Sequence, residues 1–144
     1  MSKDLVHSVD VKVALNAAAI TATTATTAMD VQGYESLTFI VSVGTFATFD
    51  GTNNLTVNVQ RGNQSDGSDA ANIAASGYIE SYENGTSGWD RVMDAATQDE
   101  TVYAIGVHID PAYRYYRCNI VEAGTVSAVV GVSALLGHAR RMPV

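Results

Sequence analysis

The chain has 144 residues, which suits one domain with an ordinary hydrophobic core, and 47% of them are hydrophobic, which excludes a compositionally disordered protein. Only 16% are charged and the formal net charge is −7, so we expect neither a general nucleic-acid binder nor a binder of anionic membranes. No apolar run approaches the roughly 20 residues of a membrane-spanning helix.

The first seven residues contain no charged region followed by an apolar stretch, so the sequence predicts no signal peptide. The single cysteine, Cys118, cannot form an internal disulfide. Both features favour synthesis in a cytoplasm.

Hydrophobic side chains alternate with polar or small ones along most of the chain, which predicts half-buried β-strands. In residues 9–15 every odd-numbered side chain is Val or Leu, so that face is expected to point to the core. The other predicted strands are residues 37–43, 55–60, 102–109, 113–121 and 126–136. The last of these is a long apolar run, which is typical of a central strand.

Turn-forming residues separate these strands. The main turn signals are Asp50-Gly51, Asp66-Gly67, Asp110-Pro111 and Glu122-Ala123-Gly124. Helical signal is weak and limited to short helices at residues 68–75 and 89–96. We therefore expect an all-β protein, an antiparallel β-sandwich or jelly-roll-like barrel with one or two short helices. An immunoglobulin-like order of strands remains the alternative to a jelly roll.

The segment Ala17–Ala28 is built almost entirely of Ala and Thr. It is either a lightly packed connector or an extended arm that pairs with a neighbouring subunit through its backbone. In the second case the contact residues would be Thr23, Thr24, Thr26 and Thr27. The chain would then consist of an N-terminal strand and arm, 1–29, and a sandwich body, 30–144. Residues 62–100, with one basic and eight acidic side chains, are expected to form an acidic loop region.

A search for catalytic or metal-binding patterns finds none that is specific. The three histidines, His7, His108 and His138, lack the spacing of metal ligands. Cys118 alternates with apolar neighbours, as a buried side chain would. Turn formation accounts for the Asp50 and Asp66 loops better than calcium binding does. Acidic pairs such as Glu80/Glu83 and Asp99/Glu100 are expected to be solvated surface. We expect no enzymatic activity, no metal and no cofactor.

The run Tyr113-Arg114-Tyr115-Tyr116-Arg117 is the most distinctive cluster. On a strand, Tyr113, Tyr115 and Arg117 would share one face, and Arg114 and Tyr116 the other. Tyr and Arg are enriched at the centres of protein–protein interfaces, so the cluster is a candidate interface. The alternative is packing across strands with arginine–carboxylate pairing inside one subunit. Binding of single-stranded nucleic acid would suit the residue types but not the acidic net charge.

Two adjacent arginines, Arg140 and Arg141, follow the last predicted strand. In an acidic protein they are either a docking point for an acidic partner or a solvated tail.

Several patterns together resemble one family. They are the Ala/Thr-rich N-terminal stretch, Asp30-Val31-Gln32-Gly33-Tyr34-Glu35-Ser36-Leu37, Leu55-Thr56-Val57-Asn58-Val59-Gln60, the Tyr-Arg-Tyr-Tyr-Arg strand, and Leu135-Leu136-Gly137-His138-Ala139-Arg140. The sequence resembles the small proteins encoded beside the major capsid protein of tailed bacteriophages, which decorate and cement the capsid. Some members close on Gly-His-Pro-Arg where this chain has Ala139, and the acidic stretch 76–100 has no counterpart in the resemblance.

The resemblance implies a virion structural protein on the outer capsid surface that bridges neighbouring major capsid subunits, commonly as a homotrimer. The expected interface residues are Tyr113, Arg114, Tyr115, Arg117, Arg140 and Arg141, with the threonines of the arm as a second contact. The alternatives are another virion part, such as a head spike, a head–tail joining protein or a tail protein. A small carbohydrate-binding β domain using Trp89 and the tyrosines is a further alternative.

Overall fold

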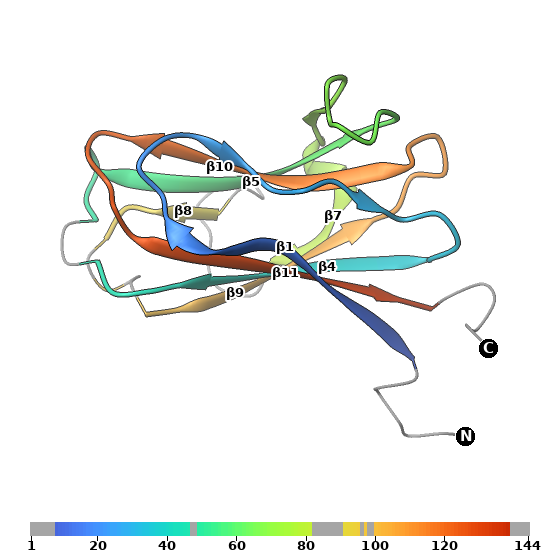
Figure 1. Ribbon diagram of the computed structural model, residues 1–144, viewed down its shortest axis with the longest axis horizontal. Helices are drawn as coiled ribbons and strands as arrows, with labels where there is room; N and C mark the ends of the chain where they lie inside the picture. Colours follow the sequence, from blue (N-terminus) through green and yellow to red (C-terminus); the bar gives the residue numbers. More distant parts are fainter. Residues whose placement is uncertain (1–7, 47–48, 82–90, 96, 98–99, 139–144) are drawn as a thin grey trace.

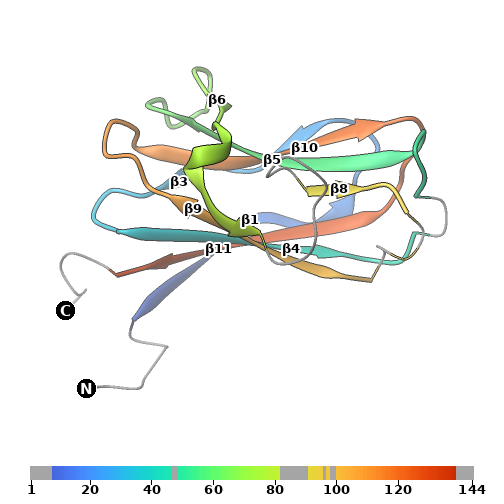
Figure 2. The ribbon, with the colours of Figure 1, turned by 180° about the vertical axis from the view of Figure 1, so that it is seen from behind.

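The computed structural model describes residues 8–46, 49–81, 91–95, 97 and 100–138 (Figure 1). Within them the chain forms two antiparallel sheets that stack face to face, as Figure 1 shows from one side and Figure 2 from the other. The all-β sandwich predicted from the alternating pattern is confirmed. Both ends of the described chain lie at the same end of the sandwich (Figure 1).

The first sheet has the order β1-β11-β4-β9-β7. Its strands are β1 (Val9–Ala19), β11 (Val129–Gly137), β4 (Ser36–Val43), β9 (Val102–His108) and β7 (Tyr78–Ser81). In β4 the residues Leu37, Phe39 and Val41 are fully buried, while the residues between them are partly exposed. This confirms the predicted alternation, because successive side chains of a strand point to opposite faces of the sheet.

The second sheet has the order β2-β10-β5-β6, with β3 also pairing β10 and β8 also pairing β5. Its strands are β2 (Thr24–Ala25), β3 (Met29–Asp30), β5 (Asn54–Gly62), β6 (Ala71–Asn72), β8 (Arg91–Met93) and β10 (Tyr115–Ala123). The core lies between the sheets. Tyr116, Phe39 and Met93 are among its largest fully buried side chains.

The strands pair in a nested order. β1 pairs with β11, the first described strand with the last; β2 and β3 pair with β10; β4 pairs with β9; and β5 pairs with β8. This is the order produced by folding one long hairpin over on itself. The additional pairs, β11 with β4 and β10 with β5, then join neighbouring parts of the hairpin into two sheets.

The expected core face of β1 is wrong for Val11 and Val13 but holds for Leu15, which packs against the core beyond a register shift between Val13 and Leu15. Val11 and Val13 are 63% and 62% exposed, and Ala14 is the buried residue of the strand. Val11 is paired with Leu135 and Val13 with Ser133, both of which lie on the outer face of β11. The odd-numbered valines of this edge strand therefore point away from the core.

The two short helices predicted for residues 68–75 and 89–96 are also absent from the described parts of those segments. The first contains turns and β6, and its last residue begins a single 3₁₀ turn, Ala75–Gly77. The second contains β8, so the region 62–100 contributes strands as well as loops. The turn at Asp50-Gly51 forms, whereas Glu122 and Ala123 still belong to β10 and the chain bends only from Gly124; each of these connections carries the chain from one sheet to the other and closes no hairpin.

The Ala/Thr-rich segment is an integral part of the sandwich and not an arm extended from it. β1 continues to Ala19, the chain crosses at Ile20, which is 2% exposed, and β2 then pairs with β10 (Figure 1). Thr26 is buried as well, at 4% exposure. The segment thus closes one open side of the sandwich.

Candidate interaction surfaces

The Tyr113–Arg117 cluster lies where β9 connects to β10. Tyr113 and Arg114 precede β10, whereas the next three residues lie within it. Tyr116 is fully buried, and Tyr115 and Arg117 lie on the outer face. The expectation that Arg114 shares the face of Tyr116 is wrong, because the strand has not yet begun at Arg114. Its guanidinium lies instead 5.3 Å from the ring centroid of Tyr115.

Two arginines of the cluster have partners within their own chain. Arg114 Nε donates to Asp30 Oδ1 at 3.1 Å and Arg114 Nη2 to Asp30 Oδ2 at 2.7 Å. Arg117 Nε donates to Gln60 Oε1 at 2.9 Å. The arginine–carboxylate pairing inside one subunit, weighed above as the alternative to an interface, is therefore present at Arg114.

The pair between Arg114 and Asp30 also sets their ionisation. The hydrogen bond from Arg114 is the largest cause that lowers the pKa of Asp30, and the same bond raises the pKa of Arg114. Both groups therefore stay charged near neutral pH, and their charges largely cancel.

Arg61 belongs to the same end of the molecule, although sequence reasoning did not single it out. Its Nη1 lies 3.1 Å from Asp110 Oδ2, and its guanidinium lies 4.2 Å from the ring centroid of Tyr113. The Asp110-Pro111 turn is the sequence signal that could have pointed to this contact. Cation–π stacking and the ion pair together hold Tyr113 against β5.

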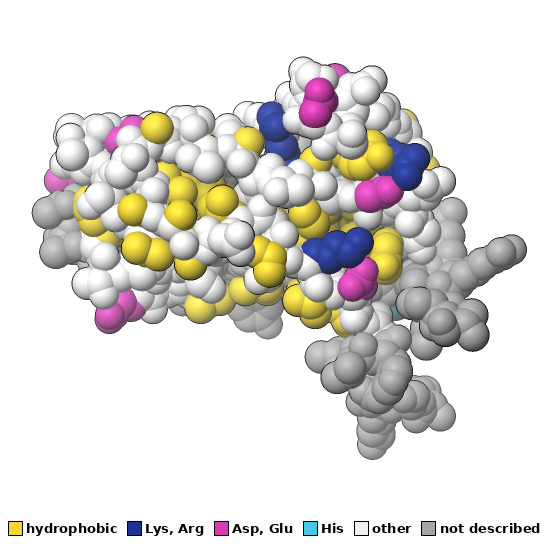
Figure 3. Space-filling model, in the orientation of Figure 1, with side chains coloured by type: hydrophobic (Ala, Val, Ile, Leu, Met, Phe, Trp, Pro, Cys, Tyr) yellow, Lys and Arg dark blue, Asp and Glu magenta, His cyan; other side chains and the backbone are white. Residues whose placement is uncertain are grey.

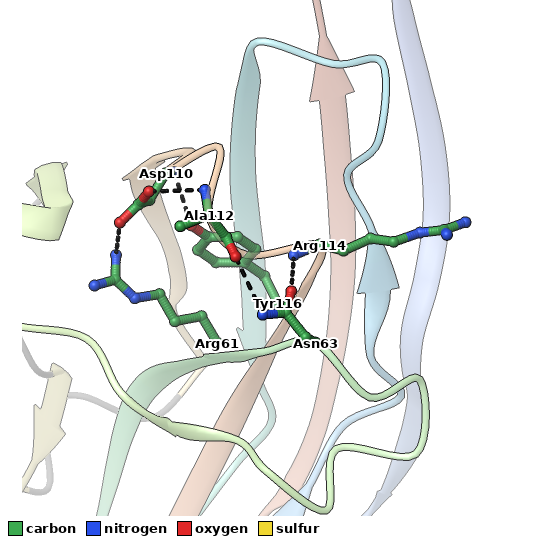
Figure 4. Close-up of polar contacts among 6 residues, drawn as sticks. All are labelled: Arg61, Asn63, Asp110, Ala112, Arg114 and Tyr116. Carbon is green, nitrogen blue, oxygen red and sulfur yellow. Dashed lines mark hydrogen bonds and ion pairs between the residues drawn. The ribbon is translucent and has the colours of Figure 1, made fainter.

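Hydrogen bonds from Asn63 and Asp110 fix the path of the β9–β10 connection (Figure 4). Asn63 Nδ2 donates to the carbonyl of Ala112 at 3.1 Å, and Asn63 Oδ1 accepts the N–H of Arg114 at 3.0 Å. Asp110 Oδ1 accepts the N–H of Ala112 at 3.0 Å, and the hydroxyl of Tyr116 accepts the N–H of Asp110 at 2.9 Å. The connection is therefore a preorganised surface. The sequence alone does not reveal this role of Asn63, because its hydrogen-bond partners lie about 50 residues away.

The outer face of the first sheet is a second candidate surface, and we call it the uncharged sheet face. No Asp, Glu, Lys or Arg lies among its described residues on the four strands β1, β11, β4 and β9. They are Val9, Val11, Val13, Val129, Gly131, Ser133, Leu135, Ser36, Thr38, Ile40, Ser42, Val102, Ala104, Gly106 and His108.

The exposed large hydrophobic side chains of the described residues concentrate on this sheet. They are Val11, Val13, Ile79, Val102 and Val129, each between 47% and 64% exposed. All five lie on strands of the first sheet, and the second sheet has none of them. A single exposed apolar residue needs no explanation, but a group on one face marks an interaction surface.

The second sheet presents a different outer face. Across β10 and β5, Arg117 is opposite Gln60, Asn119 is opposite Asn58, which is itself buried at 7% exposure, and Val121 is opposite Thr56. This face is mostly polar. Figure 3 views the edge of the sandwich along which the chain passes from β1 to β3; it shows hydrophobic side chains on that edge, and Lys and Arg side chains toward the end where β1 begins and β11 ends.

Of the expected arm residues, Thr26 is unavailable to a neighbouring subunit. Its hydroxyl accepts the N–H of Cys118 at 3.0 Å, and its own N–H donates to the carbonyl of Cys118 at 2.9 Å. Thr23 and Thr27 are exposed and Thr24 is partly exposed. Arg140, Arg141 and Trp89 lie outside the described residues.

The residues considered above as catalytic or metal-binding candidates have structural roles. Cys118 is fully buried, and burial raises the pKa of its thiol. Asp50 Oδ1 accepts the N–H groups of Thr52 and Asn53, as expected of a turn former. Among the described residues no group of three or more His, Cys, Asp or Glu side chains is placed to hold a metal ion.

A comparison with models of known protein families found no match, and a search of curated proteins found none either. In the part of the chain that the structure describes, there is also no helix with the length and hydropathy needed to cross a membrane.

Proposed function

We propose that this protein is a virion structural protein that decorates the outer surface of a bacteriophage capsid and stabilises it by bridging neighbouring major capsid subunits. The observation that carries the proposal is that four of the five exposed large hydrophobic side chains of the described residues, Val11, Val13, Val102 and Val129, lie on the uncharged sheet face. A chain with net charge −7 whose described residues on the outer face of β1, β11, β4 and β9 include no Asp, Glu, Lys or Arg has a surface suited to another protein.

The order of strands supports the same proposal. With β2 and β3 counted as one position, the nested pairs follow the strand order of a jelly roll, and the short strands β6 and β7 are added at the sheet edges. Jelly rolls occur in viral capsid domains, although the fold alone does not determine function. The resemblance noted in the sequence points in the same direction.

The size of the face suits attachment to a lattice. Four strands about 4.8 Å apart and about eight residues long give a flat area of about 500 Å². This is a little under two-thirds of the roughly 800 Å² that each partner contributes to a specific protein–protein interface. Several copies assembled as a homo-oligomer, a trimer by the resemblance, would raise the affinity for a repeating lattice without any new contact.

The experiment measures binding to expanded, DNA-free capsids of the phage that encodes the chain. A V13K/V129K variant places two lysines on the uncharged sheet face, and we expect its occupancy on the capsid to fall at least tenfold. V121K, on the outer face of β10, is the matched control and should bind as the unmodified chain does. Because these positions are exposed or partly exposed, circular dichroism should show folded protein for all three.

If V13K/V129K and the unmodified chain occupied the capsid equally, the uncharged sheet face would not be the surface that binds the capsid. Electron microscopy of the same samples tests the role itself. Density on the outer capsid surface supports decoration. Density at the portal or on the tail, or rings formed by the isolated chain, would instead identify another virion part.

A further inference from the structure

β1 is an edge strand of the first sheet. Within the described residues it pairs with β11 on one side, and no described strand pairs with residues 9–13 on the other. At Ala14 that other side is occupied, because the Ala14 carbonyl accepts the N–H of Thr27 at 2.9 Å. We call residues 9–13 the open edge. Such an edge offers backbone N–H and C=O groups to an extended strand that meets it.

The backbone groups that the open edge offers follow from the hydrogen bonds of β11. The carbonyl of Ala128, just before β11, accepts a hydrogen bond on the side of β1, and that of Val129 accepts one on the side of β4. Because these groups alternate along a strand, the even-numbered residues of β11 face β1. Their partners in this part of β1 are Asp10 and Lys12. The N–H and C=O groups of the odd-numbered residues of the open edge therefore point away from β11.

The side chains of the open edge also alternate. Val11 and Val13 are exposed on the uncharged sheet face, whereas Asp10 and Lys12 lie on the opposite face of the strand. Lys12 Nζ lies 3.5 Å from Asp10 Oδ2, and the two side chains are 44% and 41% exposed. A lysine on an edge strand often serves only to discourage pairing. Here, however, the carboxylate and the ammonium lie one residue to either side of Val11, so a copy turned end for end presents the opposite charge at each position.

We propose that the open edge pairs with the open edge of a second copy of this chain, antiparallel, about a two-fold axis at Val11. Each Val11 then lies opposite the other, and Asp10 of each chain lies opposite Lys12 of its neighbour. About six backbone hydrogen bonds join the two edges in this register. An axis at Asp10 or at Lys12 would place like charges directly opposite each other, which is destabilising. The charges therefore select the register centred on Val11.

The pairing joins two first sheets edge to edge into one. Under the proposed function, the two uncharged sheet faces then form one surface of about 1,000 Å², more than the roughly 800 Å² of a specific interface. That consequence rests on the proposed function, whereas the pairing itself is tested in solution without a capsid. A chain that dimerises but does not bind capsids would reject the proposed function alone. The contact is two-fold and differs from the three-fold contact that the resemblance implies.

The first test is sedimentation equilibrium of the full chain, which should show a dimer at high micromolar concentration. K12D and D10K each place like charges opposite each other, and each should raise the dissociation constant at least tenfold. An equimolar mixture of K12D and D10K should form a heterodimer, because every facing pair then has opposite charges. A fold damaged in one variant would not be repaired by adding the other. A monomeric unmodified chain, an assembly that both variants leave intact, or a mixture that stays dissociated would overturn the proposal.

The second test is oxidative cross-linking, which leaves Asp10 and Lys12 in place. Cys118 is fully buried, so a new cysteine on the surface is the one that reacts. The Cα atoms of the two Val11 residues would lie about 5.5 Å apart, within the range of a disulfide, so V11C should form a covalent dimer. V13C is the matched control, because Val13 is equally exposed but would lie about 13 Å from its copy. We expect V11C to cross-link at least ten times faster than V13C, and equal rates would overturn the proposed register.

Discussion

Asp30 and Arg114, 84 residues apart in sequence, are joined by two parallel hydrogen bonds of 3.1 and 2.7 Å. Asp30 is the last residue of β3, and Arg114 is the last residue before β10. The pair therefore fastens β3 to the strand with which it pairs. The N–H of Val31, which donates to the carbonyl of Arg114 at 3.0 Å, makes a second connection at the same point.

R114A should bring the pKa of Asp30 back toward its ordinary value of 3.8. The folded-state pKa of Asp30 is lowered, so the pair stabilises the fold at neutral pH. That contribution is lost as the pH falls below 3.8 through the lower folded value. NMR titration of the Asp30 carboxyl in both proteins measures the change. An unaltered titration in R114A would show that the hydrogen bond does not cause the shift.

T26V should destabilise the protein, because the buried N–H of Cys118 loses the hydroxyl that accepts its hydrogen bond. Leaving a buried donor unpaired costs about 1–3 kcal/mol, and valine has nearly the same shape as threonine. Urea unfolding measures the change. T27V is the matched control at an exposed neighbour and should alter the free energy of unfolding by less than about 0.5 kcal/mol. Equal stability of T26V and T27V would contradict the role given to Thr26.

Removal of residues 1–28 should prevent folding. The deletion takes away β1 and β2, leaving the edge of β11 and the part of β10 at Asn119 and Ile120 unpaired, and it removes Ile20 from the core. If the segment were a detachable arm, its removal would leave a soluble, folded body. Far-ultraviolet circular dichroism and gel filtration of the truncated chain distinguish the two results, and a monomeric, cooperatively unfolding β protein would show that the segment is dispensable.

The parts of the fold that sequence predicted well are those in which burial alone decides the pattern. In β4 the residues Leu37, Phe39 and Val41 are larger and more apolar than those between them, so both the strand and its buried face are evident. In β1 the valines show which side chains share a face but not which face meets the core. The small Ala14 fits against the other sheet, and the valines remain outside.

The interaction surfaces were harder to predict because they depend on pairing between distant segments. The Ala/Thr-rich segment is too uniform to fix its own register, which Thr26 sets by bonding to Cys118 across 92 residues. The uncharged sheet face is likewise invisible until β1, β11, β4 and β9 are placed side by side. Only the candidate cluster around Tyr113 and Arg114 was evident from local sequence.

The thiol of Cys118 should be unreactive in the native protein. It is fully buried, and burial raises its pKa, so almost no thiolate exists near neutral pH and reagents have no access. A disulfide reagent should label it only in denaturant, with a midpoint that coincides with unfolding followed by circular dichroism. Rapid labelling under native conditions would mean that β10 opens locally or that the thiol is accessible.

G124A should destabilise the fold, whereas G51A should not. Gly124 has a φ of +75°, and a Cβ there would collide with the carbonyl oxygen of Thr52, a backbone atom that cannot swing away. A left-handed non-glycine residue alone costs on the order of 1–3 kcal/mol, and the collision adds to it. Gly51 has nothing within 4 Å of an added Cβ and no left-handed φ, so alanine there should leave stability unchanged or slightly raised. Thermal unfolding of both variants makes the comparison, and equal melting temperatures would show that the β10–β11 connection rearranges to accept a side chain.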